Sequence, residues 1–158
     1  MNLQKLLRPK SIAVVGASEK VGFSSDTCKN ILTYNPEHQR VYFVNPKRDE
    51  VFGRKCYHTL GEIDDTIDLV ILCTPQKTII PLLEEAHQKG CGGAVIYAAG
   101  YSEVGSAEGK EAERQLKAVA EQLGIAVMGP NCVGFINYID NVFAFACTSK
   151  VRDRKGRI

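Results

Sequence analysis

The sequence lacks the features of several large classes of protein. It has no tryptophan, and its 20 basic residues nearly balance its 18 acidic ones, which leaves a net charge of +2. A charge this small gives no reason to expect a nucleic-acid partner. No apolar run approaches the length of a membrane span, and the N-terminus has no signal-peptide hydrophobic region. We therefore expect a cytoplasmic protein with neither nucleic acid nor membrane as a partner.

Motifs for metal binding and for several kinds of catalysis are also missing. The six cysteines are dispersed without a C-x-x-C pair, so the sequence offers neither metal-ligand spacing nor a compact disulfide framework. The three histidines are isolated and without obvious partners, and we expect exposed or packing side chains. A P-loop ending in Gly-Lys-Ser/Thr, an H-E-x-x-H motif, a Ser/His/Asp set and a Tyr-x-x-x-Lys pair are all absent. The sequence therefore predicts no metal site and no catalytic residue.

What is present is a regular alternation of two kinds of segment. A chain of 158 residues, of which 44% are hydrophobic, can form one domain with a proper core. Short runs rich in β-formers alternate with segments at helical spacing, which indicates βαβ units and a parallel sheet. We predict an α/β fold, a Rossmann-like doubly wound sheet in a single domain. The predicted strands are 12–15, 40–44, 68–73, 93–97 and 125–128, and the helices between them are 24–34, 77–89 and 106–123.

The remaining segments complete the predicted domain organisation. Residues 1–10 form a lead-in with a short helix, residues 11–147 form the Rossmann-like domain, and the basic segment 148–158 is a linker toward a following domain. Within the domain, 51–57 reads as irregular, 59–63 as a short helical turn and 142–146 as a last strand.

The stretch around which the rest is organised runs from Ser11 to Gly22. A strand ends at Gly16, a loop follows, and a helix begins near Ser24. Glycine at position 16 suits a tight turn, and Gly22 lets the helix start close to a ligand. The helix N-terminus attracts phosphate, and serine hydroxyls can cap the helix or meet phosphate oxygens. Because the loop reads G-A-S-x-x-x-G and not G-x-G-x-x-G, a purely structural glycine turn stays as the alternative.

The residues after the second strand bear on the kind of nucleotide. A site for NAD would place an acidic residue here to bind the ribose hydroxyls. The chain instead has Asn45-Pro46-Lys47-Arg48, which favours an adenosine ribose that carries a phosphate, as in NADP or coenzyme A. The alternative is a surface turn with solvated charges.

Three further loops follow the carboxyl ends of predicted strands. Thr74-Pro75 and Ala98-Ala99-Gly100 are small or stiff and leave room for a flat base or a thin chain. In the third loop, Asn131 can both donate and accept hydrogen bonds. Cys132 would sit near the reactive end of a ligand, although a thiol is more often a small buried hydrophobe, and its role stays open.

Several pieces of the sequence resemble the coenzyme A-binding domain of the nucleoside-diphosphate-forming acyl-CoA synthetases, whose relatives include the α subunit of succinyl-CoA synthetase. The pieces are LLRPKSIAVVGAS, VYFVNPKRDEVFGRKCYHTL, DLVILCTP, GAVIYAAGYSEVG and GIAVMGPNCVGFIN. They occur in the family's order between Leu6 and Asn137, and the Val-Asn-Pro-Lys and Gly-Pro-Asn-Cys pieces are the specific ones.

The resemblance implies that the domain binds coenzyme A in an extended pose. It assigns the phosphates to the loop 18–23, the adenosine end to Lys47, the walls of the groove to the ends of the third and fourth strands, and the acyl end to the last loop. The residues expected to bind coenzyme A are therefore Gly16, Ser18, Glu19, Lys20, Val21, Gly22, Phe23, Asn45, Lys47, Thr74, Pro75, Tyr97, Ala98, Ala99, Asn131 and Cys132.

The resemblance also implies what this chain does not contain. In the family, the reaction passes through an acyl phosphate and a phosphohistidine in the next domain, and an ATP-grasp part supplies the nucleotide chemistry. None of the three histidines here matches the catalytic one, so we expect the chain alone to be inactive and to need those domains or a subunit as partners. Three alternatives stay open: an NADP-dependent oxidoreductase domain, a coenzyme A- or nucleotide-sensing regulatory domain, and the coenzyme A-binding part of a protein lysine acetyltransferase. The sequence also leaves open the acyl substrate, the choice between ADP and GDP, and whether the protein forms a homo-oligomer.

Overall fold

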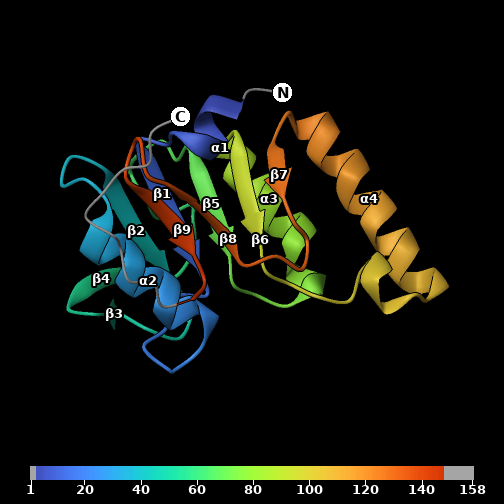
Figure 1. Cartoon of the computed structure of the whole chain (residues 1–158), viewed down its shortest axis with the longest axis horizontal. Helices are drawn as coiled ribbons and strands as arrows, with labels where there is room; N and C mark the ends of the chain where they lie inside the picture. The colour runs from blue at the N-terminus through green and yellow to red at the C-terminus, as the bar shows by residue number, and fades with distance from the viewer. Residues whose placement is uncertain (1–2, 148–158) are drawn as a thin grey trace.

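The computed structural model describes residues 3–147, and the predicted linker at 148–158 lies outside the described residues. The main sheet has seven strands in the order β3-β4-β2-β1-β5-β6-β7 (Figure 1). All neighbours pair in parallel except β3, which pairs antiparallel with β4. The strands are β1 (Ser11–Val15), β2 (Arg40–Val44), β3 (Glu50–Val51), β4 (Arg54–Tyr57), β5 (Leu69–Leu72), β6 (Gly93–Ile96) and β7 (Ala126–Met128).

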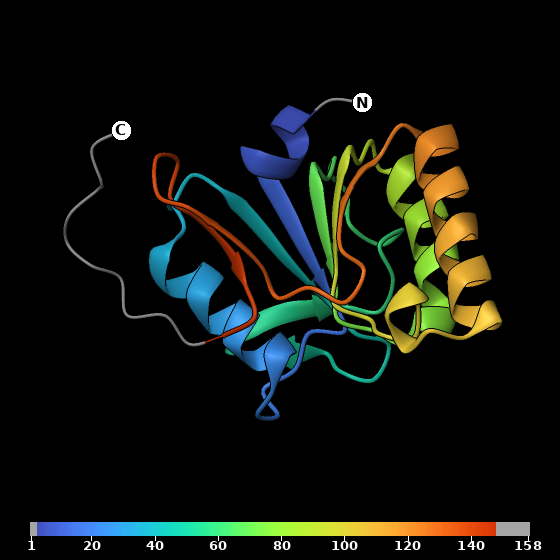
Figure 2. The same cartoon turned by 45° about the vertical axis from the view of Figure 1, so that its right-hand side comes forward.

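Helices cover both faces of the sheet, as a doubly wound fold requires. Helix α2 (Phe23–Tyr34) lies on one face, and α3 (Ile79–Gln88) and α4 (Ala107–Leu123) lie side by side on the other (Figure 2). Helix α1 (Leu3–Leu7) leads into β1, and two short 3-10 helices, η1 (Gln76–Thr78) and η2 (Ser102–Val104), follow β5 and β6. The part of the chain that the structure describes has no helix with the length and apolar character of a membrane span.

The central strand β1 supplies both halves of the core. Ile12 and Val14 point toward α2 and pack in one cluster with Ile31, while Ala13 and Val15 belong to a second cluster on the α3 and α4 face. All five residues of β1 are buried, which is why the strand is apolar at every position after Ser11. Chain order reverses between β1 and β5, so the doubly wound fold predicts the ligand site beyond the carboxyl ends of these strands.

Segment 51–57 differs from the sequence prediction, whereas the turn at 59–63 and the strand at 142–146 are present. The irregular stretch at 51–57 is a β-hairpin whose second strand, β4, extends the sheet beside β2. The expected helical turn at 59–63 is a single hydrogen-bonded turn, in which the Ile63 N–H donates to the Leu60 carbonyl over 3.1 Å. The last predicted strand, β9 (Val142–Phe145), does not join the main sheet but pairs antiparallel with β8 (Gly134–Asn137).

The β8–β9 hairpin packs beside α2, on the same face of the main sheet. Two asparagines fix the hairpin there, one within α2 and one at the C-cap of that helix. The buried Asn30 amide donates to the carbonyls of Phe145 and Cys147 over 2.9 and 2.8 Å, and the Asn35 side-chain oxygen accepts from the Phe143 N–H over 2.8 Å. The helix that begins at the glycine loop is therefore buttressed from both sides.

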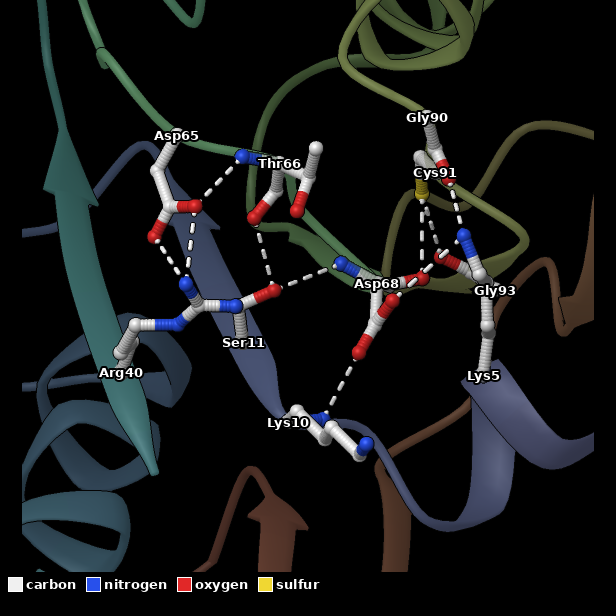
Figure 3. A network of polar contacts seen from close by, with 10 residues as sticks. All are labelled: Lys5, Lys10, Ser11, Arg40, Asp65, Thr66, Asp68, Gly90, Cys91 and Gly93. Carbon is white, nitrogen blue, oxygen red and sulfur yellow. Dashed lines mark hydrogen bonds and ion pairs between the residues drawn. The ribbon is translucent and has the colours of Figure 1, made fainter. Parts of the chain in front are cut away.

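A polar network joins the amino ends of the strands, at the edge opposite to the glycine loop (Figure 3). Asp68 is its centre. Its carboxylate accepts from the Lys10 N–H over 2.8 Å and lies 3.5 Å from the Lys5 ammonium. Its N–H donates to the Ser11 hydroxyl, and its carbonyl accepts from the N–H of Gly93. The network therefore ties β1, β5 and β6 to the lead-in helix.

Replacing Asp68 with alanine should lower the free energy of unfolding by about 1–2 kcal/mol, because the Lys10 N–H loses its acceptor and the Lys5 ammonium loses its ion-pair partner and keeps only the Gly90 carbonyl. Urea denaturation measures the change. Asp64 is an exposed aspartate four residues earlier, so Asp64→Ala is the matched control and should be close to neutral. Equal losses in the two variants would contradict the structural role of Asp68.

Candidate functional site

The glycine loop leaves β1 through a turn that only glycine fits. Gly16 has a φ of +83°, and a Cβ there would lie 2.7 Å from the Cys73 carbonyl oxygen. The N–H groups of Gly16 and Ala17 both donate to the Val44 carbonyl, over 2.8 and 3.1 Å. The loop is thus held between the carboxyl ends of β2 and β5, and the turn predicted at Gly16 is confirmed.

Helix α2 begins at Gly22 without a capping side chain. Gly22 is the N-cap with a φ of +147°, and no side chain in the described part of the chain caps the first turn. The serine hydroxyls expected to cap the helix bond to the loop instead: Ser24 donates to the Gly16 carbonyl over 2.8 Å, and Ser25 to the Glu19 carbonyl over 3.4 Å. The first N–H groups of α2 and the positive end of its dipole are therefore left for an anion.

A cavity of about 360 Å³, the phosphate-loop cavity, opens at this helix start. Its loop side carries the Lys20 ammonium and the hydroxyls of Ser18 and Ser24, and none of the described residues that line it is acidic. Its wall comes from the ends of β5 and β6. The lining residues are Ser18, Lys20, Val21, Gly22, Phe23, Ser24, Cys73, Thr74, Tyr97 and Ala98.

A second cavity, of about 670 Å³, lies beyond the ends of β1, β2 and β5 beside α3, and we name it the α3-side cavity. It is mainly apolar, with Lys47, Lys77 and His58 among its polar residues. The lining residues are Val15, Gly16, Val44, Pro46, Lys47, His58, Thr59, Leu60, Thr74, Pro75, Lys77, Thr78, Pro81, Leu82 and Glu85. Because Thr74 lines both cavities, they adjoin each other at the carboxyl edge of the sheet.

His58 is a residue of this site that the sequence did not single out. Contrary to the expectation that it lacks partners, its ring lies between two carboxylates: Nε2 is 3.1 Å from Asp49 and Nδ1 is 3.7 Å from Glu62. Lys77 was missed as well. A signal for it existed, because it lies two residues after Thr74-Pro75, at the start of the next helical segment.

The site residues predicted from the sequence fall into two groups. Eleven lie in one or both cavities: Gly16, Ser18, Lys20, Val21, Gly22, Phe23, Lys47, Thr74, Pro75, Tyr97 and Ala98. Of the described residues, the other five, Glu19, Asn45, Ala99, Asn131 and Cys132, line neither cavity.

Glu19 and Asn45 hold the loop rather than facing the cavities. The Glu19 carboxylate accepts from the Phe52 N–H over 2.6 Å, which fixes the loop to the β3–β4 hairpin. The Asn45 amide donates to the Ala17 carbonyl over 2.8 Å, and its oxygen accepts from the Lys47 N–H over 3.0 Å. Asn45 therefore positions both the loop and the residue bearing the cation of the α3-side cavity.

The loop of Asn131 and Cys132 is bonded to the end of β6. The Asn131 N–H donates to the Ala98 carbonyl over 2.9 Å, and the Cys132 thiol contacts the Ile96 carbonyl at 3.5 Å. Both residues thus adjoin the end of β6 that carries Tyr97 and Ala98, next to the phosphate-loop cavity.

Two buried thiols near this wall, those of Cys28 and Cys73, are not activated as nucleophiles. Burial raises the pKa of Cys28 to about 12, and burial also raises the pKa of Cys73. Burial also raises the pKa of the Tyr97 phenol well above its ordinary value. Within residues 3–147, no group of histidine, cysteine and acidic side chains could hold a metal ion. The arrangement can bind an elongated anion, and its described residues offer no evident catalytic group.

Comparison with known proteins identifies a family model and several longer proteins that this chain resembles. A family model described as a CoA binding domain matches residues 10–138. The chain is 42% identical over 140 residues to a trans-feruloyl-CoA synthase from an unknown prokaryotic organism, covering 89% of this chain and 20% of that protein. It is 41% identical over 138 residues to the ADP-forming acetate–CoA ligase of Methanocaldococcus jannaschii, covering 85% and 18%.

A solved structure supports the same relationship. It is the dinucleotide-forming acetyl-coenzyme A synthetase 1 of Ca. Korarchaeum cryptofilum in complex with phosphate and ADP, with a TM-score of 0.83 and 31% identity. The match covers 91% of this chain and 30% of that one. The chain therefore spans only about a fifth of the two curated relatives named above.

Proposed function

The chain belongs to the family of CoA binding domains, and from this premise we propose that it binds coenzyme A across the phosphate-loop and α3-side cavities. Its role would be that of the coenzyme A-binding domain of an ADP- or NDP-forming acyl-CoA synthetase. One observation carries the proposal: the segment that matches the family, residues 10–138, contains every residue that lines the two cavities.

The chemistry of the two cavities suits the parts of coenzyme A. The diphosphate would meet the first N–H groups of α2 and the Lys20 ammonium. The adenine would lie on the apolar floor of the α3-side cavity, where Lys47 would pair with the 3′-phosphate of the ribose. The pantetheine arm would pass Tyr97 and Ala98, with the thiol directed toward Asn131 and Cys132.

We assign the chain a binding role within a larger ligase. Its relatives are about three to six times longer than the segment they share with it, and the described residues offer no evident catalytic group. The phosphohistidine and the ATP-grasp chemistry would come from partner domains or a subunit. Because the relatives are named for acids as different as ferulate and acetate, we propose that those other parts select the acid.

Calorimetric titration of the protein with coenzyme A and with NADPH tests this function. We expect coenzyme A to bind with a Kd in the micromolar range and NADPH to give no heat of binding, because the site lacks a partner for a nicotinamide. Binding of NADPH without coenzyme A would reverse the assignment in favour of an oxidoreductase domain. Failure of both ligands to bind would refute the proposal for this chain.

A further inference from the structure

We propose that Thr27, a buried residue that does not line the site, is a positioning residue: through the Tyr97 hydroxyl it holds an aromatic wall, formed by Tyr97 and Phe23, against the pantetheine arm of coenzyme A. The inference rests on the proposed function and adds to it a residue that discriminates between parts of the ligand.

The first observation is a directed chain of hydrogen bonds. The Thr27 hydroxyl lies 2.9 Å from the Tyr97 hydroxyl and 2.8 Å from the Phe23 carbonyl. A carbonyl can only accept, so the single Thr27 proton goes to Phe23, and the Tyr97 hydroxyl must donate to Thr27. Burial raises the pKa of Tyr97, so its hydroxyl keeps the proton that it donates. The series of hydrogen bonds therefore runs from Tyr97 through Thr27 to the first turn of α2.

The second observation is the position of the two rings. The Phe23 ring meets the Tyr97 ring edge to face, with centroids 6.3 Å apart and an angle of 77° between the planes. Tyr97 is 8% exposed, whereas Phe23 is 56% exposed at the rim of the phosphate-loop cavity. The hydroxyl pair thus connects the end of β6 with the start of α2 and fixes the separation of the two sides of the cavity.

The third observation is that the two sides of the phosphate-loop cavity differ in polarity. Ser18, Lys20 and Ser24 supply charge and hydroxyls on one side, whereas Phe23 and Tyr97 are apolar toward the other. A ligand that suits both sides carries phosphate at one point and a thin, weakly polar chain next to it. In coenzyme A the pantetheine arm follows the diphosphate directly, so the aromatic wall would cover the arm and not the phosphates.

Binding of two ligands separates this role from a general one. Adenosine 3′,5′-bisphosphate has the adenosine end of coenzyme A but lacks the arm. We expect Thr27→Val, which keeps the shape and removes the hydroxyl, to weaken coenzyme A about fivefold, the effect typical of one lost hydrogen bond, and to leave the bisphosphate unchanged. Thr27→Ser restores the hydroxyl and should restore binding. Tyr97→Phe should match Thr27→Val, and the double variant should be no weaker than either.

The outcomes distinguish this inference from the proposed function. If the unmodified protein binds no coenzyme A, the proposed function fails. If the unmodified protein binds coenzyme A but Thr27→Val weakens both ligands equally, or neither, the positioning role is overturned. The same follows if Thr27→Ser binds as weakly as Thr27→Val, or if the effects of Thr27→Val and Tyr97→Phe add in the double variant.

Discussion

Replacing Lys47 with alanine should weaken the binding of coenzyme A by about 10- to 100-fold and leave dephospho-coenzyme A nearly unaffected, because a charge-assisted contact to a phosphate is worth roughly 1.5–3 kcal/mol. Dephospho-coenzyme A lacks only the 3′-phosphate. The difference between the two ligands therefore reports on the single contact that Lys47 is proposed to make.

The position of Lys47 supports an effect of this size. It is exposed at the mouth of the α3-side cavity, and the Asn45 oxygen fixes its N–H over 3.0 Å, which limits the freedom of the backbone that carries the ammonium. The nearest alternatives in that cavity are less suited. Lys77 belongs to η1 on the opposite side, and His58 already has Asp49 and Glu62 as neighbours.

Calorimetry of both ligands measures the prediction, and Lys110→Ala provides the matched control. Lys110 is an exposed lysine of α4, so its replacement removes the same charge far from the two cavities. We expect the control to change neither affinity by more than twofold, since exposed charges are screened at physiological salt within about 8 Å. Equal weakening of coenzyme A and dephospho-coenzyme A by Lys47→Ala would show that Lys47 does not meet the 3′-phosphate.

The sequence predicts the buried strands well and the edges of the fold poorly. Strands β1 and β5 are covered on both faces, so nearly every residue is apolar and the pattern is plain. Strand β4 contains Arg54 and Lys55 and pairs with β2 through only two residues, so its composition resembles a loop. Strand β9 is as apolar as a sheet strand, so its composition does not reveal that it pairs with β8 instead of joining the main sheet.

The sequence likewise predicts only some features of the candidate site. Residues expected at the carboxyl ends of strands, such as Lys47 and Thr74, do line the cavities, because topology alone brings these ends together. Glu19 and Asn45 were predicted to bind the ligand, yet their side chains bond to backbone groups of neighbouring loops. The sequence does not reveal such partners, since every residue carries the same backbone donors and acceptors. Thr27 was overlooked for the same reason: its role depends on Tyr97, which lies 70 positions away.

Replacing Gly16 with alanine should lower the free energy of unfolding by about 3 kcal/mol or more and abolish the binding of coenzyme A. Two costs combine. A φ of +83° disfavours a side chain by about 1–2 kcal/mol, and the added Cβ would lie 2.7 Å from the Cys73 carbonyl oxygen. That oxygen belongs to backbone held by the Val15 carbonyl, so it cannot move aside without disturbing β5. The loop would have to shift instead, and with it the start of α2.

The Gly90→Ala variant separates the cost of the positive φ from the cost of the close approach to the Cys73 carbonyl. Gly90 has a nearly identical φ of +79°, but a Cβ there would meet no atom within 4 Å, and the residue follows α3 far from the cavities. Urea denaturation should therefore give a loss of about 1 kcal/mol for Gly90→Ala, the backbone cost alone, with coenzyme A binding retained. If both variants lost the same stability and both still bound coenzyme A, the close approach at Gly16 would not be what shapes the loop, and the phosphate site would depend on α2 alone.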